Sequence, residues 1–221
     1  MILQHTIAKH YQEQVTIRIN PRYISEYVGS NIKKFANSHS DFLSSLENMV
    51  WPSGSQFNRF SPFKVYSFSI KDCHYSDPVP VESLKKYKKI EDFIGHKEDY
   101  RQSIWYKEMS KKLAQYGHVN HKNHIFKSQQ ELDSFFENYI LGMAESLMSK
   151  GYDHTIDQDY PRIMIGKNGE IHKSNAGDHR FFMSKIVGVS SMPFTIKGVH
   201  ESFFKTHNIQ IVSVVWTRSL M

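Results

Sequence analysis

Residues 161–200 read PRIMIGKNGEIHKSNAGDHRFFMSKIVGVSSMPFTIKGVH. Apolar residues alternate over 162–166, which predicts a strand. Asn168-Gly169 is a dipeptide typical of a tight turn, so residues 170–172 are expected to return as a second strand. The first part of this stretch is therefore predicted to be a β-hairpin.

A helix and a further strand are predicted to follow the hairpin. The run Asn-Ala-Gly-Asp at 175–178 breaks the strand, and apolar residues then recur at helical spacing from Asp178 onward. Gly188 is expected to end the helix. Residues 192–199 form another strand-like run, led by a proline.

The start of this helix has the features of an anion site. The first amides of a helix have no intrahelical partner and carry the positive end of its dipole. Gly177 would let a phosphate approach the backbone, and His179 and Arg180 add side-chain donors at the same place. The alternative interpretation makes Asp178 a helix cap and leaves Arg180 in solvent, and the spacing alone does not separate the two.

The same residues carry a resemblance to a known superfamily. A turn, a Gly-x-His-Arg motif at a helix start and a strand led by proline resemble the pattern of the ParB/sulfiredoxin-like superfamily. The resemblance covers about the last third of the chain. The matching positions are Asn168-Gly169-Glu170-Ile171, Gly177, His179-Arg180, Ser184-Lys185, Gly188, Met192-Pro193 and Val199-His200.

The resemblance implies an α+β fold, with a mixed sheet and flanking helices. Residues 61–221 would form the ParB/sulfiredoxin-like domain, with a helical insertion at about 97–150. Residues 1–60 would be an N-terminal α/β elaboration. The whole chain has 221 residues and is 39% hydrophobic, enough for a substantial folded core.

The resemblance also implies nucleotide chemistry. Gly177, His179, Arg180 and Lys185 would hold the phosphates of ATP or CTP, with Mg²⁺. The protein would be a phosphotransferase or an NTPase, with a small-molecule or glycan-type acceptor. Arg180→Ala would then abolish nucleotide binding and leave the fold intact.

A carboxylate or His179 would orient the acceptor or a metal in such a site. The candidate carboxylates are Asp157, Asp159, Glu170 and Asp178. The two aspartates before the hairpin are equally typical of a solvated loop. Sulfiredoxin activity needs a cysteine beside the His-Arg pair, where this chain has Asp178, and its one cysteine is Cys73.

Two other functions remain open from the sequence. A DNA-associated nucleotide switch fits the net charge of +6, but no helix-turn-helix segment follows the motif, so only weak DNA binding is expected. A non-catalytic anion-binding module would keep the site and lack turnover. No apolar run is long enough to cross a membrane, and a cytoplasmic location is expected.

Two clusters elsewhere have alternative interpretations. The run Lys-Lys-Tyr-Lys-Lys at 85–89 is typical of a solvated helix face. His118, His121 and His124 have a spacing that zinc sites use, but an exposed basic loop is the simpler interpretation, and it would add to an anion site when protonated.

The rest of the chain gives predicted elements without chemistry. Helices are predicted over 22–36, 41–50, 82–90, 99–116 and 128–150, and strands over 11–20, 63–70 and 207–220. Ser128 and Glu131 form a capping box for the longest helix, and Gly151 ends it. The superfamily resemblance implies that either Glu82 or Asp72 is an acid near the phosphates, and the alternative interpretation makes Glu82 a cap of the 82–90 helix.

Overall fold

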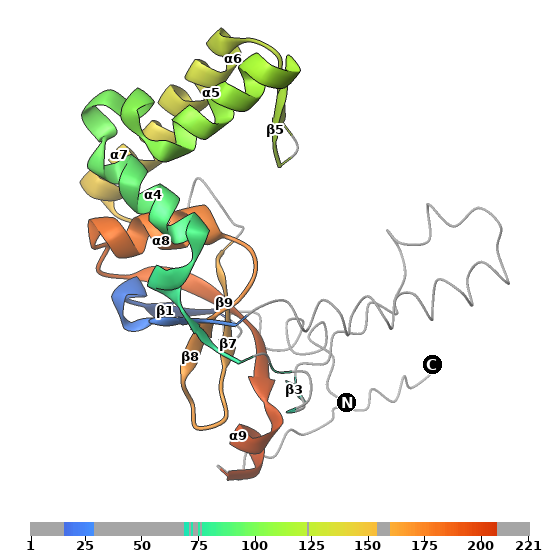
Figure 1. Cartoon of the computed structure of the whole chain (residues 1–221). Coiled ribbons are helices and arrows are strands. Elements are labelled where there is room, and N and C mark those ends of the chain that lie inside the picture. Colours follow the sequence, from blue (N-terminus) through green and yellow to red (C-terminus); the bar gives the residue numbers. More distant parts are fainter. Residues whose placement is uncertain are drawn as a thin grey trace, which may run out of the picture.

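The protein is a mixed α+β molecule in which helices cover one face of a mixed β-sheet (Figure 1). This computed structural model describes residues 16–28, 69–70, 72, 75, 77–122, 124–153 and 160–206. The predicted elements at 41–50 and 207–220 lie outside these residues.

The sheet has seven strands in the order β1-β9-β7-β8-β2-β4, and β3 also pairs with β9. β7 and β8 form the predicted antiparallel hairpin, and β9 runs parallel to β7. The strands are β1 (Thr16–Ile19), β2 (Glu26–Tyr27), β3 (Ser69–Ile70), β4 (Val79–Pro80), β7 (Arg162–Ile165), β8 (Ile171–Lys173) and β9 (Met192–His200).

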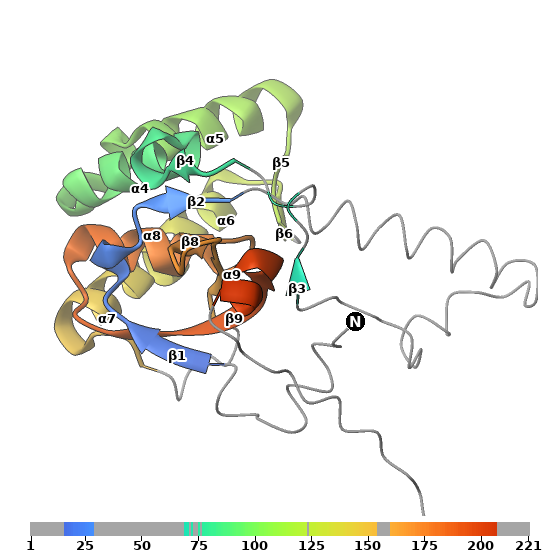
Figure 2. The same ribbon diagram turned by 90° about the horizontal axis from the view of Figure 1, so that it is seen from below.

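The helices of residues 85–187 stack in layers above this sheet (Figures 1 and 2). α8 (Asp178–Val187) lies on the sheet and packs against α4 (Lys85–Gly95) and α7 (Gly142–Lys150), and α5 (Ile104–Tyr116) packs on α4. α6 (Gln129–Ser134) and a π-helical segment (Phe135–Leu141) run directly into α7. α9 (Glu201–Thr206) follows β9, and short 3-10 helices span Pro21–Tyr23, Val81–Ser83 and Lys97–Gln102.

Several predictions for the C-terminal half are confirmed. The predicted hairpin, helix and strand of 161–200 are β7-β8, α8 and β9, and α8 ends at Gly188, which has a left-handed φ of 82°. Ser128 accepts a hydrogen bond from the amide of Glu131 and caps α6. Gly151 follows α7 with a φ of 70°.

The predicted helix over 22–36 is wrong for the residues that the structure describes. Residues 21–23 form a 3-10 turn and 26–27 form β2, which pairs with β8 on one side and β4 on the other. Ile24 and Val28 are fully buried on either side of the short strand β2. Their separation by four residues resembles helical spacing, although the described residues 24–28 form no helix. Long-range strand pairing, which spacing does not reveal, decides the structure here.

The predicted loop at 117–124 is a second small sheet. β5 (Val119–His121) and β6 (His124–Phe126) pair as a hairpin, with His121 opposite His124.

The predicted helix over 99–116 begins later, at Ile104, where the Ser103 side chain accepts a hydrogen bond from the Tyr106 amide. β1 and β2 join the same sheet as β7–β9, so the described part of residues 1–60 is built into the main sheet.

The face of the sheet away from α8 carries a small polar and apolar cluster. Val28, Ile70 and Met164 pack there beside Tyr75. The hydroxyl of Tyr75 lies 2.7 Å from Nδ1 of His172, a buried residue of β8. None of the helices in the described ranges combines the length and the apolar character needed to span a membrane.

Candidate functional site

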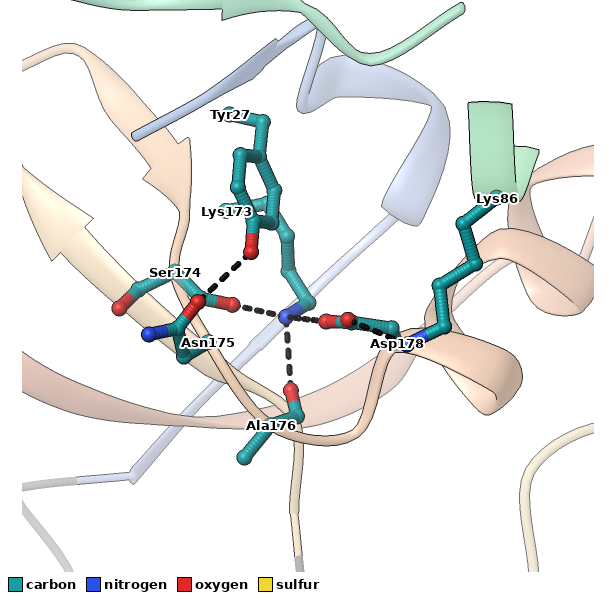
Figure 3. A network of polar contacts seen from close by, with 7 residues as sticks. All are labelled: Tyr27, Lys86, Lys173, Ser174, Asn175, Ala176 and Asp178. Carbon is teal, nitrogen blue, oxygen red and sulfur yellow. Dashed lines mark hydrogen bonds and ion pairs between the residues drawn. The ribbon is translucent and has the colours of Figure 1, made fainter. Parts of the chain in front are cut away.

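A buried lysine organises the loop before α8 (Figure 3). Nζ of Lys173 donates to the carbonyl oxygens of Ser174 and Ala176, the latter at 2.7 Å, and lies 2.9 Å from Oδ1 of Asp178. The side chain is fully buried at the end of β8. An ammonium has three donors, and these three acceptors use all of them. Burial lowers the pKa of Lys173 to about 8, although Asp178 acts in the opposite direction.

The loop backbone turns sharply at two left-handed residues, Ala176 and Gly177, with φ of 77° and 67°. A Cβ added to Gly177 would lie 2.6 Å from Cα of Pro161, so this position has no room for a side chain. The sequence predicted that a glycine here would admit a phosphate. The structure gives it a different reason, which is close packing against Pro161.

Asp178 is already held by two lysines. Oδ1 faces Lys173, and Oδ2 lies 2.9 Å from Nζ of Lys86 on α4. Burial alone would raise the pKa of this carboxyl group, but Lys173 and Lys86 outweigh burial and hold the pKa below its usual value. As the first residue of α8, the carboxylate also meets the positive end of the helix dipole. Asp178 therefore joins α8 to α4, and this is a different role from the acid expected from the sequence.

In the Gly-Asp-His-Arg motif at 177–180, the side chain of His179 lines a pocket. A pocket of about 300 Å³ lies where α4, α5, β5 and α8 meet. Its lining residues are Lys85, Lys86, Lys89, Ile90, Trp105, His121 and His179. The three lysines come from the run that the sequence assigned to a solvated helix face. Their spacing puts them on the side of α4 that faces His179, so part of that face is a pocket wall.

Two histidines and a tryptophan form the aromatic part of the lining. The rings of His121 and His179 stack with centroids 5.2 Å apart and planes 18° from parallel. Trp105 contacts both rings, at 5.2 Å from His179 and 5.6 Å from His121. Burial, together with Lys86 and Lys122, lowers the pKa of His179 to about 3 and that of His121 to about 4. Both imidazoles are therefore neutral at pH 7.

One nitrogen on each of these rings is buried without a hydrogen-bond partner among the residues that the structure describes. The atoms are Nδ1 of His179, whose side chain is 5% exposed, and Nε2 of His121. An unsatisfied buried polar atom costs about 1–3 kcal/mol, so folded proteins rarely keep two side by side without a reason. Both atoms are enclosed, so a ligand in the adjoining pocket would contact other parts of the two rings.

Arg180 faces a different pocket from His179. This second cavity, of about 280 Å³, lies against α7 and the π-helical segment. Its lining residues are Tyr139, Gly142, Met143, Ser146, Leu147, Gly151, Tyr152, Asp153 and Arg180. The two motif residues were expected to meet the same phosphates. The side chains of successive helix residues point about 100° apart. His179 and Arg180 therefore line pockets on different sides of α8.

The other residues expected at the site lie elsewhere. Lys185 is in the last turn of α8, where Nζ donates to the carbonyl oxygens of Arg22 and Ile24 and pairs with Glu82 at 3.2 Å. Glu82 is therefore an ion-pair partner and not the cap of α4, whose cap residue makes no side-chain hydrogen bond.

Glu170 lies in the hairpin turn at the opposite end of β8 from the loop. Hydrogen bonds from the side chain and backbone of Asn168 hold its pKa below the usual value. Asp157 and Asp159 lie outside the residues that the structure describes. Of the candidate residues, the structure thus brings only His179 to the basic pocket and Asp178 to its edge.

The sequence missed four of the lining side chains, Lys85, Lys86, Lys89 and Trp105, as parts of a site. The only local signal for the three lysines was the basic run itself, and Trp105 had the spacing of an ordinary core residue. The histidines of 118–124 were expected to add to an anion site when protonated. His121 does lie at the basic pocket, but burial keeps it neutral at pH 7, and His118 and His124 are exposed. Comparisons of the chain with protein-family models, with curated proteins and with solved structures find no match.

Proposed function

We propose that the pocket between α4 and α8 binds the phosphate groups of a nucleotide, ATP or CTP, and that the protein is a phosphotransferase or an NTPase. The observation that carries this proposal is the lining itself. Three lysines face two neutral imidazoles, that of His179 in the first turn of α8 and that of His121 on β5. The resemblance of residues 161–200 to the ParB/sulfiredoxin-like superfamily supports the same ligand class.

The lining suits phosphoryl chemistry in two ways. Lysine ammonium groups neutralise phosphate oxygens as point charges. Phosphoryl transfer depends mainly on positioning and on charge stabilisation, and a preformed cationic pocket supplies both. The neutral rings of His121 and His179 form an aromatic wall of the pocket without adding charge. The acceptor is a small molecule or a glycan-type hydroxyl.

A thermal-shift panel tests the binding step. ATP, CTP, ADP and adenosine are compared on the full chain. We expect the phosphorylated compounds to raise the midpoint of unfolding, because a ligand that binds only the folded state stabilises it. Adenosine, which has no phosphate, is the control and should leave the midpoint unchanged. Stabilisation by adenosine equal to that by ATP would contradict a phosphate-directed site.

Point variants locate the site. We expect Lys86→Gln to weaken ATP binding about tenfold, which corresponds to the loss of one charge-assisted contact. Lys88→Gln is the matched control, because Lys88 is on the same helix, is exposed and does not line the pocket. Arg180→Ala distinguishes the two pockets. If Arg180→Ala abolishes binding and Lys86→Gln does not, the nucleotide belongs in the pocket beside α7.

One observation favours a second candidate, a binding module without turnover. Among the described residues, the carboxylate at the first turn of α8 is Asp178, and both its oxygens are engaged by lysines. It is therefore poorly placed to accept a proton from an acceptor. Release of ADP or inorganic phosphate from bound ATP separates the two candidates. Nucleotide binding with no release above the rate in buffer would favour the module.

A further inference from the structure

The charged groups around the basic pocket are unevenly matched. Asp178 is shared between Lys86 and Lys173, and Glu108 of α5 pairs with Lys89. Lys85 makes no ion pair with a described residue. The ammonium groups of Lys85, Lys86, Lys89 and Lys173 against two carboxylates leave an excess of +2, because His121 and His179 are neutral at pH 7. Lys122 adds a further positive charge that acts on both histidines.

This set of side chains is poor for a divalent cation. Mg²⁺ is held by carboxylates and by phosphate oxygens in near-octahedral geometry. The only two carboxylates in this balance are already bound to lysines, and Nδ1 of His179 and Nε2 of His121 are enclosed. A net positive charge also repels a cation. The Mg²⁺ implied by the superfamily resemblance therefore does not fit the described residues of this pocket, and Asp157 and Asp159 lie outside them.

The same charges match a phosphate monoester. The terminal phosphate of such a ligand carries between one and two negative charges near pH 7, which the excess positive charge around the pocket can neutralise. A volume of about 300 Å³ is at the small end of the range for ligand sites. A cavity of this size accommodates a phosphoryl group with a small adjoining part of its molecule.

We propose that the pocket takes a dianionic phosphoryl group directly on its lysines, without a bridging divalent cation. This deepens the proposed function and rests on it, since it specifies the charge state and the metal requirement of the same ligand. The source is either the terminal phosphate of a nucleotide or another phosphate monoester, and both present the same dianion.

Calorimetric titration with AMP, in EDTA and in millimolar MgCl₂ at equal ionic strength, tests the metal requirement. We expect the affinity in EDTA to equal or exceed that in MgCl₂, because Mg²⁺ masks phosphate charge. Binding that appears only with MgCl₂, or is about tenfold tighter with it, would overturn the inference and leave the proposed function standing. No binding of any phosphorylated compound in either buffer would instead defeat the proposed function.

Cyclic AMP tests the charge of the ligand, because it has the same base and sugar but a singly charged phosphodiester. We expect it to bind at least about tenfold more weakly than AMP. Equal affinities would overturn the dianion requirement. Competition between inorganic phosphate and AMP separates a nucleotide ligand from another phosphate monoester. If inorganic phosphate binds with an affinity similar to that of AMP, the phosphoryl group alone is recognised. If it binds much more weakly, the nucleoside contributes to binding.

Lysine variants test whether the pocket lysines carry the binding. Lys85→Gln and Lys89→Gln should each weaken AMP binding in EDTA by about tenfold, and Lys88→Gln should change it by less than about twofold. An equal loss in all three variants would show binding to the general positive field of α4, and it would contradict a direct contact. Circular dichroism of each variant confirms that the fold is retained.

Discussion

Lys173 is the residue on which the loop before α8 depends most. Its side chain is fully buried. Its ammonium group donates hydrogen bonds to two loop carbonyl groups and to the carboxylate of Asp178, the first residue of α8. Through Asp178 it also reaches Lys86, a pocket residue. A buried ion pair contributes little net stability as a whole, but removing one partner leaves the other uncompensated. The role of Lys173 is therefore to position the loop.

Lys173→Met is expected to lower the free energy of unfolding by about 3–5 kcal/mol, because Asp178 and two carbonyl groups lose their donor. Urea denaturation measures this. Lys88→Met, on an exposed site of α4, is the control and should change stability by less than about 0.5 kcal/mol. The double variant Lys173→Met/Asp178→Asn should lose less than the sum of its single variants. Simple additivity would show that the two side chains act independently.

Gly177 gives a second prediction for a single residue. Gly177→Ala should destabilise the fold by about 2–4 kcal/mol, since alanine disfavours a positive φ and its Cβ would meet the backbone of Pro161. Gly95→Ala is the matched control, because a Cβ there has no neighbour within 4 Å. Thermal unfolding of both variants checks this, and similar losses in the two would contradict the close approach at Pro161.

At the scale of elements, the pocket is made where the β5–β6 hairpin brings His121 onto His179 of α8. The folded protein holds both rings neutral, with pKa values of about 4 and 3 against 6.5 for an unperturbed histidine. Between these values the unfolded chain binds more protons than the folded one. The free energy of unfolding therefore falls as the pH falls from about 6.5 toward 4.

His179→Asn is expected to make this acid-induced loss of stability less steep. Between about pH 6.5 and pH 4, each such histidine lowers the free energy of unfolding by about 1.4 kcal/mol for each unit by which the pH falls. Asparagine does not titrate, so the variant lacks this contribution. Urea denaturation at several pH values between 6.5 and 4.5 gives the slopes. His118→Asn is the control, because His118 is exposed. Equal slopes for His179→Asn and the wild type would mean that His179 is not held neutral in the fold.

The sequence predicts some elements far better than others, for physical reasons. The hairpin, α8 and its end at Gly188 depend on short-range patterns, namely a turn dipeptide, helical spacing and a left-handed glycine. The predicted helix at β2 is wrong, because only pairing with β4 and β8 makes these residues a strand. The β5–β6 hairpin was missed, because its short strands are surrounded by polar residues.

The pocket was harder to foresee than the fold. Its residues come from four elements, and Lys86 and Asp178 are 92 positions apart in the chain. His179 was found through its motif, whereas the lysines of α4 resembled an ordinary solvated face. His179 and Arg180 do not share a pocket as expected, because the side chains of successive helix residues point about 100° apart.

At the scale of the whole molecule, one sheet supports two cavities on either side of α8. The described strands of the N-terminal region, β1 and β2, lie in the same sheet as β7–β9. The helical segment of 97–150 provides Trp105 and His121 to the basic pocket and most of the lining of the other pocket. The predicted helical insertion is thus part of both candidate binding sites.

The central claim is that a phosphoryl group binds against His121 and His179. NMR spectra of protein labelled at its 13 histidines, recorded while AMP is added, test it most directly. Spectra of His121→Asn and His179→Asn assign the two signals. We predict that these two imidazole signals shift in a saturable way while that of exposed His118 stays in place. Saturable shifts confined to other histidines, with His121 and His179 unchanged, would contradict the account.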